Sequence, residues 1–197
     1  MNRASPWILA AVLAGCAFAP AADAPTSLSV LDQLPADVPR HARTHLTLVV
    51  FPPEARPSID TVQMAYTSQP HALAYFARHR WAERPPQMLQ PLLVRTLEAT
   101  GAFTAVVGPP LAGNGTLALR TELTQLVQDF TSDPPVVQLS LRVRLSDDRA
   151  QKVLGTREMA LRETMQQKSP AAGAAAANAA LARALRETAQ FVLERMP

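Results

Sequence analysis

A strict alternation of apolar and polar residues most constrains what this chain can fold into. In residues 137–145 every second residue is Val or Leu, and the residues between them are Gln, Ser or Arg. Successive side chains of a β-strand point to opposite faces of a sheet, so the pattern predicts a strand with one buried and one solvated face. Residues 117–127, whose phase shifts near Leu126 as at a bulge, and residues 153–163 show weaker versions of the same pattern. We expect these segments to form three consecutive antiparallel strands, whose polar faces carry both signs of charge, as a solvated sheet surface does.

The chain ends in an alanine-rich segment with a helical pattern. Alanine strongly favours helix, and residues 171–196 carry one continuous apolar stripe. The stripe consists of Ala177, Leu181, Leu185, Ala189, Val192 and Met196. The sequence therefore predicts a long helix that covers one face of the sheet. A helix laid on lipid or on a partner protein is the alternative, and the few basic residues argue against lipid.

A second helix is expected over about residues 86–100. Pro86 suits the first turn of a helix, where its missing N–H is not needed, and Gly101 supplies a stop. Leucines and Met88 recur between them at helical spacing. Pro91 lies about one turn inside, so it either bends the helix or marks a later start.

Shorter strands are expected upstream of these elements, at residues 27–31, 45–51, 59–66, 71–81 and 103–107. The alternation in residues 71–81 places Tyr75 and Trp81 on one common face. Taken together, the elements predict an α+β fold, with a mostly antiparallel sheet of about six to seven strands packed with two main helices (about 86–100 and 171–196).

The N-terminus has the layout of a bacterial lipoprotein signal. A short apolar run follows Arg3 and closes on Leu13-Ala14-Gly15-Cys16. The run has signal-peptide length, and the small residues give a peptidase room to cleave between Gly15 and Cys16. We therefore expect a signal peptide over residues 1–15, a lipidated N-terminus and flexible tether over 16–26, and a single domain over 27–197. The alternatives are an ordinary signal peptide with a chance cysteine, or a buried free thiol.

Several classes of chemistry find no support in the sequence. The net charge of +3 comes from 19 basic and 16 acidic residues, without a basic patch interleaved with aromatics, which argues against nucleic-acid binding. His41 and His45 have the spacing of a helical metal pair, but they lack the HExxH context of a metal site. The chain has no Gly-x-Ser-x-Gly elbow, so we predict a protein that is not an enzyme and holds no metal or dissociable cofactor.

Two aromatic residues are candidate anchors. Trp81 stands between a predicted strand and a predicted helix, where it either packs at their junction or anchors a partner from an exposed position. Tyr75 lies on the same predicted face, and its hydroxyl needs a hydrogen-bond partner if it is buried.

A set of short motifs resembles one family along nearly all of the chain after Cys16. The motifs are Leu48-Val49-Val50-Phe51-Pro52-Pro53, Tyr75-Phe76, His79-Arg80-Trp81, Pro85-Pro86-x-Met88-Leu89 and Gly101-x-Phe103. Together with the cysteine signal they resemble the ABC-type transport auxiliary lipoprotein family, whose members include the lipoprotein of paraquat-inducible transport systems. Residues 27–31 depart from the family because they lack its usual tyrosines.

The resemblance implies a lipid-anchored periplasmic accessory component of an ABC/MCE-type envelope transport system. Such a component docks the inner-membrane machinery to the outer membrane for lipid transport. Its partners would be an MCE-domain protein, the inner-membrane ABC permease and ATPase, and the membrane itself. A homo-oligomer stays open as a further arrangement.

The same resemblance implies a diacylglycerol and an N-acyl chain, such as palmitate, on Cys16. Ala17 is not the aspartate that retains lipoproteins at the inner membrane of enteric bacteria, so we expect the periplasmic face of the outer membrane rather than the inner membrane. A structural or regulatory envelope lipoprotein and a periplasmic lipid-binding module are the alternative functions.

Overall fold

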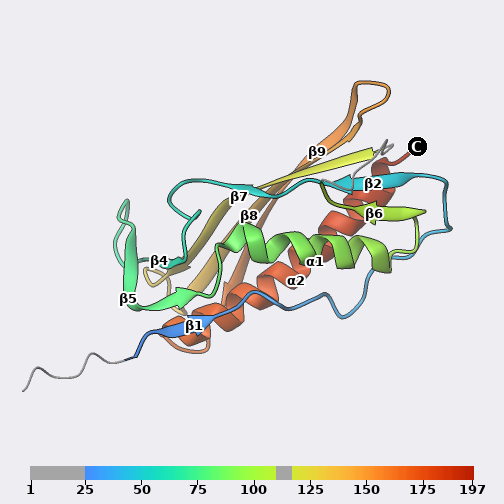
Figure 1. Ribbon diagram of the computed structural model, residues 1–197. Helices are drawn as coiled ribbons and strands as arrows, with labels where there is room; N and C mark the ends of the chain where they lie inside the picture. Colours follow the sequence, from blue (N-terminus) through green and yellow to red (C-terminus); the bar gives the residue numbers. More distant parts are fainter. Residues whose placement is uncertain (1–24, 110–116) are drawn as a thin grey trace, which may run out of the picture.

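The computed structural model describes residues 25–109 and 117–197, which form a nine-stranded sheet and two helices (Figure 1). The elements in chain order are β1 (Ser27–Ser29), β2 (Thr47–Val50), β3 (Glu54–Ala55), β4 (Gln63–Thr67), β5 (Ala74–Trp81), α1 (Pro85–Ala99), β6 (Ala105–Val107), β7 (Leu117–Asp129), β8 (Val136–Asp147), β9 (Lys152–Thr164) and α2 (Pro170–Arg195). The lipoprotein signal, including Gly15 and Cys16, and most of the tether lie outside the described residues.

Strand β7 is the centre of the sheet. One of its edges pairs antiparallel with β8 along its whole length, and β9 continues that antiparallel order beyond β8. Its other edge pairs in turn with β2, β3 and β4, all parallel to it. Pro52 and Pro53 separate β2 from β3, and because proline donates no backbone hydrogen bond the chain follows β7 in short pieces.

The expected antiparallel order is therefore right for β7, β8 and β9 but wrong for the sheet as a whole. The sheet is mixed, and it has nine strands rather than six or seven. Besides the pairs along β7, β1 runs parallel to β5 and β2 runs parallel to β6. The connection from β2 to β6 includes α1, which makes the crossover that parallel neighbours require. Alternation of residue types reports which face is buried, and it carries no information on the direction of the neighbouring strand.

Both predicted helices are present, and Figure 1 shows them on the same side of the sheet. α1 is continuous through Pro91, and Gly101 ends it with a φ of 71°. α2 begins where the Ser169 hydroxyl accepts a hydrogen bond from the Ala172 N–H at 3.2 Å, the usual N-cap arrangement. Its apolar stripe packs on β8 and β9, with Leu181 and Leu185 at most 1% exposed. This layer contains the hydrophobic core.

Strand β5 is less regular than its sequence predicts. The two-residue step from Gln63 to Ala65 in β4 lies opposite the five-residue step from Arg80 to Tyr75 in β5. Three additional residues of β5 therefore interrupt the alternation, and an odd number inverts its phase. Tyr75 and Trp81 nevertheless both contact the hydrophobic core.

Candidate functional site

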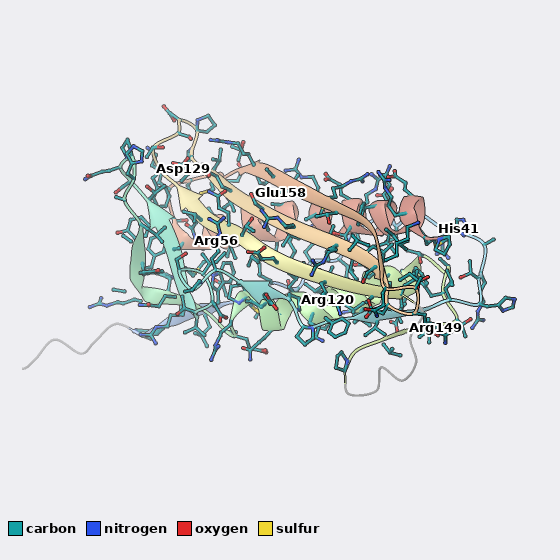
Figure 2. All side chains as sticks on the ribbon, turned by 90° about the horizontal axis from the view of Figure 1, so that it is seen from above. His41, Arg56, Arg120, Asp129, Arg149 and Glu158 are labelled. Carbon is teal, nitrogen blue, oxygen red and sulfur yellow. The ribbon has the colours of Figure 1, made fainter. Side chains whose placement is uncertain are left out.

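The face of the sheet opposite the helices is open and polar. In Figure 2 the strands are seen from this side, with α2 behind them. Polar side chains on β7, β8 and β9 form rows across the strands. In one such row, Arg142 of β8 is paired with Glu122 of β7 on one side and with Glu158 of β9 on the other. Its guanidinium donates to the Glu122 carboxylate at 3.1 Å and to the Glu158 carboxylate at 3.3 Å. All three side chains are more than a third exposed, so these ion pairs stabilise the fold little and leave the row accessible. We call this surface the open face.

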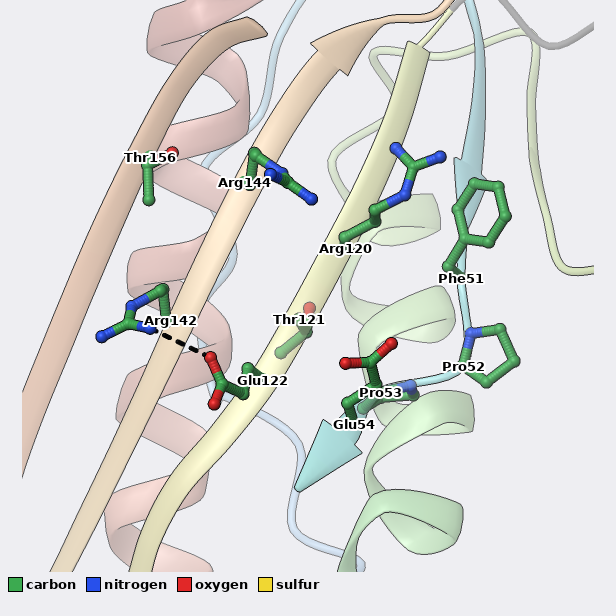
Figure 3. A pocket seen from close by; sticks show the side chains of 10 residues that line it. All are labelled: Phe51, Pro52, Pro53, Glu54, Arg120, Thr121, Glu122, Arg142, Arg144 and Thr156. Atoms are coloured by element: carbon green, nitrogen blue, oxygen red, sulfur yellow. Dashed lines mark hydrogen bonds and ion pairs between the residues drawn. The ribbon is translucent and has the colours of Figure 1, made fainter. Parts of the chain in front are cut away.

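A groove of about 580 Å³ lies along one side of the open face (Figure 3). One wall is the segment from Phe51 to Glu54, which carries the chain from β2 into β3, and the other wall is formed by β7 and β8. The guanidinium of Arg120 lies 4.3 Å from the centre of the Phe51 ring, a cation–π contact that holds the arginine against this wall. The residues that line the groove are Phe51, Pro52, Pro53, Glu54, Arg120, Thr121, Glu122, Arg142, Arg144 and Thr156.

Two arginines face each other across the strands at this groove. Arg120 of β7 and Arg144 of β8 occupy directly opposite positions, an arrangement that destabilises a sheet when the charges are alike. Arg120 is held by Ser146 at 3.2 Å and by Asp148 at 3.4 Å. Arg144 reaches toward β7 in Figure 3, and it has no hydrogen-bond or ion-pair partner among the residues that the structure describes. The groove therefore offers positive charge to an anionic group.

Two carboxylates at the ends of the strands stay ionised for different reasons. The Ser146 hydroxyl, which donates at 2.7 Å, and the Arg120 guanidinium hold the pKa of Asp148 below its ordinary value, although burial opposes them. Burial also acts to raise the pKa of Asp129 at the end of β7. Hydrogen bonds from Thr131, Ser132 and Gln138 outweigh that effect and leave the pKa of Asp129 lowered. Both groups are therefore negative at neutral pH and fix the geometry at the ends of the strands.

The two aromatic residues singled out from the sequence differ in burial. Trp81 is 4% exposed and lies in the core, and its backbone N–H donates to the Val62 carbonyl at 2.7 Å. Tyr75 is half-buried against the core, and its hydroxyl donates to the Ser58 carbonyl at 2.9 Å. Neither residue lines the groove on the open face.

Sequence reasoning missed the groove itself. The alternation assigns Arg120 and Arg144 to a solvated face of the sheet, and the structure places both on that face. Their opposition depends on the pairing of β7 with β8, and the Phe51 wall depends on the parallel pairing of β2 with β7. The one available signal was the Phe-Pro-Pro sequence directly after a strand, which indicates a chain that bends at the edge of a sheet.

Residues 25–109 and 117–197 contain neither a cluster of metal ligands nor a membrane-spanning helix. No three His, Cys, Asp or Glu side chains gather closely enough there to hold a metal ion. Neither α1 nor α2 combines the length and the apolar character that a membrane-spanning helix needs.

Comparison with solved structures identifies the class of fold. The structure resembles protein XCC0632 from Xanthomonas campestris, of the DUF330 family, with a TM-score of 0.73 at 22% identity over 86% of this chain and 95% of that one. An uncharacterized protein matches with a TM-score of 0.71 at 15% identity, over 86% of this chain and 99% of that one. The hypothetical protein CT253 from Chlamydia trachomatis matches with a TM-score of 0.54 at 11% identity, over 77% of this chain and 98% of that one. These identities establish a shared fold and nothing further.

The family follows from the sequence match. The model of the ABC-type transport auxiliary lipoprotein component matches residues 28–189, so this chain belongs to that family. The match confirms the resemblance inferred from the motifs, and it makes the chain an auxiliary lipoprotein of a transport system. No curated protein matches the chain.

Proposed function

We propose that this protein is a lipid-anchored docking module of an ABC/MCE-type envelope transport system. Acyl chains on Cys16 hold it at the periplasmic face of the outer membrane, and the Ala/Pro-rich tether sets its reach. The folded domain binds the MCE-domain protein that leads to the inner-membrane permease and ATPase. The machine moves lipid between the two membranes.

The observation that carries this proposal is the family match over residues 28–189 behind a Leu13-Ala14-Gly15-Cys16 signal. One acyl chain binds a membrane only marginally, whereas two or three chains give lasting attachment. Anchoring concentrates the domain near the membrane, so each contact with the partner can be weak. A docking role of this kind needs an accessible, charged surface and no catalytic group.

We assign the docking contact to the groove on the open face. Arg144 projects into it without a partner among the described residues, and Arg120 lies opposite. A carboxylate of the MCE-domain protein, placed between the two guanidinium groups, would relieve their repulsion and accept charge-assisted hydrogen bonds. The partner segment that enters the groove is therefore acidic.

The proposal is tested by co-purification of the full-length tagged protein from membranes. We expect the MCE-domain protein and the ABC components to be retained. Arg144→Glu should lower their recovery at least about tenfold, because it replaces an attraction with a repulsion. Arg95→Glu is the matched control. Arg95 lies on α1 outside the groove, and like Arg144 it is exposed and has no hydrogen-bond or ion-pair partner among the described residues.

Each part of the proposal fails separately in this experiment. Absence of the MCE and ABC components from the parent preparation refutes the transport role. Equal recovery with Arg144→Glu and with the parent refutes only the assignment of the groove. Unchanged thermal unfolding of both variants is required for either conclusion.

The lipid-binding alternative is not favoured by the cavities. The cavity between α2 and the sheet that Met64, Trp81 and Leu126 help to line has a volume of about 10 Å³. That is about the space of one water molecule and too small for an acyl chain. The larger groove on the open face is lined by charged side chains, which suit a polar partner rather than a lipid tail.

A further inference from the structure

Strand β9 leaves one long edge of the sheet unpaired. Its 13 residues pair with β8 and with no other strand of the described chain. The other strands with an unpaired edge in the described chain are shorter: β1 and β6 have three residues each, and β3 has two. An edge of this length presents a row of backbone N–H and C=O groups that can accept another strand.

The residues with outward-pointing backbone groups can be identified from two hydrogen bonds. The Met165 N–H donates inward to the Pro135 carbonyl at 2.8 Å, whereas the Arg162 carbonyl accepts from the Arg183 side chain at 2.9 Å and so points outward. Inward and outward residues alternate in an antiparallel ladder. The even-numbered residues from 156 to 164 therefore carry the free backbone groups, and a partner strand must match them.

The charges of β9 are antisymmetric about Ala160. Arg157 and Glu158 precede it, and Arg162 and Glu163 follow it at equal distances. When β9 pairs antiparallel with β9 of a second copy so that the two Ala160 residues are opposite each other, Glu158 lies opposite Arg162. Arg157 then lies opposite Glu163. Ala160 then faces itself, and a small exposed residue at that point lets the two backbones approach.

Neighbouring registers lose this match. A pairing centred on residue 158 sets Glu158 against itself, which is repulsive. Pairings centred on 159 or 161 set every one of the four charges opposite an uncharged residue. If an edge strand carried charges of one sign only, it would repel a second copy in every register, and edge pairing would be prevented. The mixed charges of β9 instead favour pairing in one register, the one centred on Ala160.

We propose that β9 pairs with β9 of a second copy of this chain, antiparallel about Ala160. The occupant of the edge is this same chain, because the strand is complementary in charge to itself. The Glu158–Arg162 pairs lie on the open face, where Glu158 already contacts Arg142, and Met159 packs beside Leu161 of the other copy on the helix side. The two-fold axis is perpendicular to the sheet, so both open faces point to the same side.

One existing contact is exchanged when the strands pair. Arg183 of α2 releases the Arg162 carbonyl, which accepts from the other copy instead, and Arg183 keeps its 2.8 Å ion pair with Glu163. The even-numbered residues of β9 from 156 to 164 are all exposed, so a second strand can reach this edge. The pairing does not depend on the proposed docking function.

Charge exchange between two variants tests the proposal. Glu158→Arg places arginine opposite arginine in a homodimer, and Arg162→Glu places glutamate opposite glutamate. Each variant of the full-length protein in detergent should dimerise at least about tenfold more weakly than the parent. Mixed together they should form heterodimers at parental strength, because both facing pairs are then Arg–Glu.

The mixture separates pairing from local damage. Each substitution also disturbs a contact within its own chain, with Arg142 for Glu158 and with Asp129 for Arg162, and mixing cannot repair those losses. Two folded variants that do not associate on mixing overturn the proposal. A parent protein that stays monomeric at all concentrations also overturns it.

Cysteine cross-linking in membranes tests the register independently. Ala160→Cys should cross-link to itself with a short bismaleimide. Thr156→Cys, also exposed on β9, is the matched control, because its two copies would lie on the order of 27 Å apart. It should cross-link instead to Thr164→Cys. The parent, whose only cysteine is Cys16, measures background. Equal cross-linking of the two single variants, or cross-linking of Ala160→Cys to a different protein, refutes the register.

Discussion

Gly173 provides a sharp test of how α2 docks on the sheet. It is the fourth residue of α2, and a Cβ atom placed there would overlap the side-chain amide of Gln128 from β7. Gln128 is 4% exposed, and its Oε1 has no hydrogen-bond partner in the described part of the chain. The backbone of Gly173 has an ordinary helical conformation, so glycine is not needed there for its conformational freedom. It is needed because the Gln128 side chain leaves no space for a Cβ atom.

Gly173→Ala should consequently destabilise the protein, the opposite of its usual effect. Within a helix, glycine to alanine normally gains about 0.8–1 kcal/mol. Overpacking a filled site costs about 1–3 kcal/mol, and Gln128 is enclosed, so we take the upper half of that range. The expected net loss is about 1–2 kcal/mol, a fall in Tm of about 2–8 °C for a domain of this size.

A double-mutant cycle with Gln128→Ala provides the control. With the obstructing side chain removed, Gly173→Ala should stabilise the protein by up to about 1 kcal/mol, which gives a coupling energy of about 2–3 kcal/mol between the two sites. Urea and thermal unfolding followed by circular dichroism measure all four proteins. Stabilisation by Gly173→Ala alone, or the same change in both backgrounds, would refute the reasoning.

Three further predictions concern the core, a helix end and pH. Trp81→Ala should lower stability by about 3–5 kcal/mol, because the side chain is buried; unchanged unfolding with lost complex formation would make Trp81 an interface residue instead. Gly101→Ala should cost about 1–2 kcal/mol in urea unfolding, since the φ of 71° strains alanine while space for a Cβ is available; no loss would contradict this. The lowered pKa of Asp129 contributes stability above the unfolded value of 3.8, and that contribution is lost as pH falls through the folded pKa. The Tm advantage of the parent over Asp129→Asn should therefore shrink on acidification, and a constant difference would exclude this linkage.

The elements with local signals could be predicted from the sequence. The alternation in residues 137–145 corresponds to β8, whose Val137, Leu139, Leu141 and Val143 are at most 1% exposed. The shift of phase expected near Leu126 corresponds to a register shift between Leu123 and Gln125. Both helices begin and end within one residue of their predicted bounds, because Pro86 and Gly101 mark the ends of α1 locally and the apolar stripe runs the length of α2.

The features that depend on long-range pairing could not be predicted. β3 has two residues and exists because Glu54 and Ala55 lie beside β7, so no local pattern announces it. The expected strand at residues 59–66 begins only at Gln63, after a turn in which the Ile59 N–H donates to the Arg56 carbonyl at 2.9 Å. The parallel pairing of β2 with β6 requires the crossover through α1, which sequence periodicity does not predict.

The candidate site shows the same division. The exposed arginines of β7 and β8 could be assigned to a solvated face, yet the opposition of Arg120 and Arg144 required the register of the two strands. The antisymmetric charges of β9 stand in the sequence, but they become meaningful only once β9 is known to be an edge.

Acylation of Cys16 is the point on which attachment at the membrane rests, and metabolic labelling with palmitate measures it directly. We expect label in the parent protein, no label in Cys16→Ser, and release of that variant from the membrane fraction. Label on Cys16→Ser, or its continued presence in membranes at the parental level, would contradict the proposed anchor.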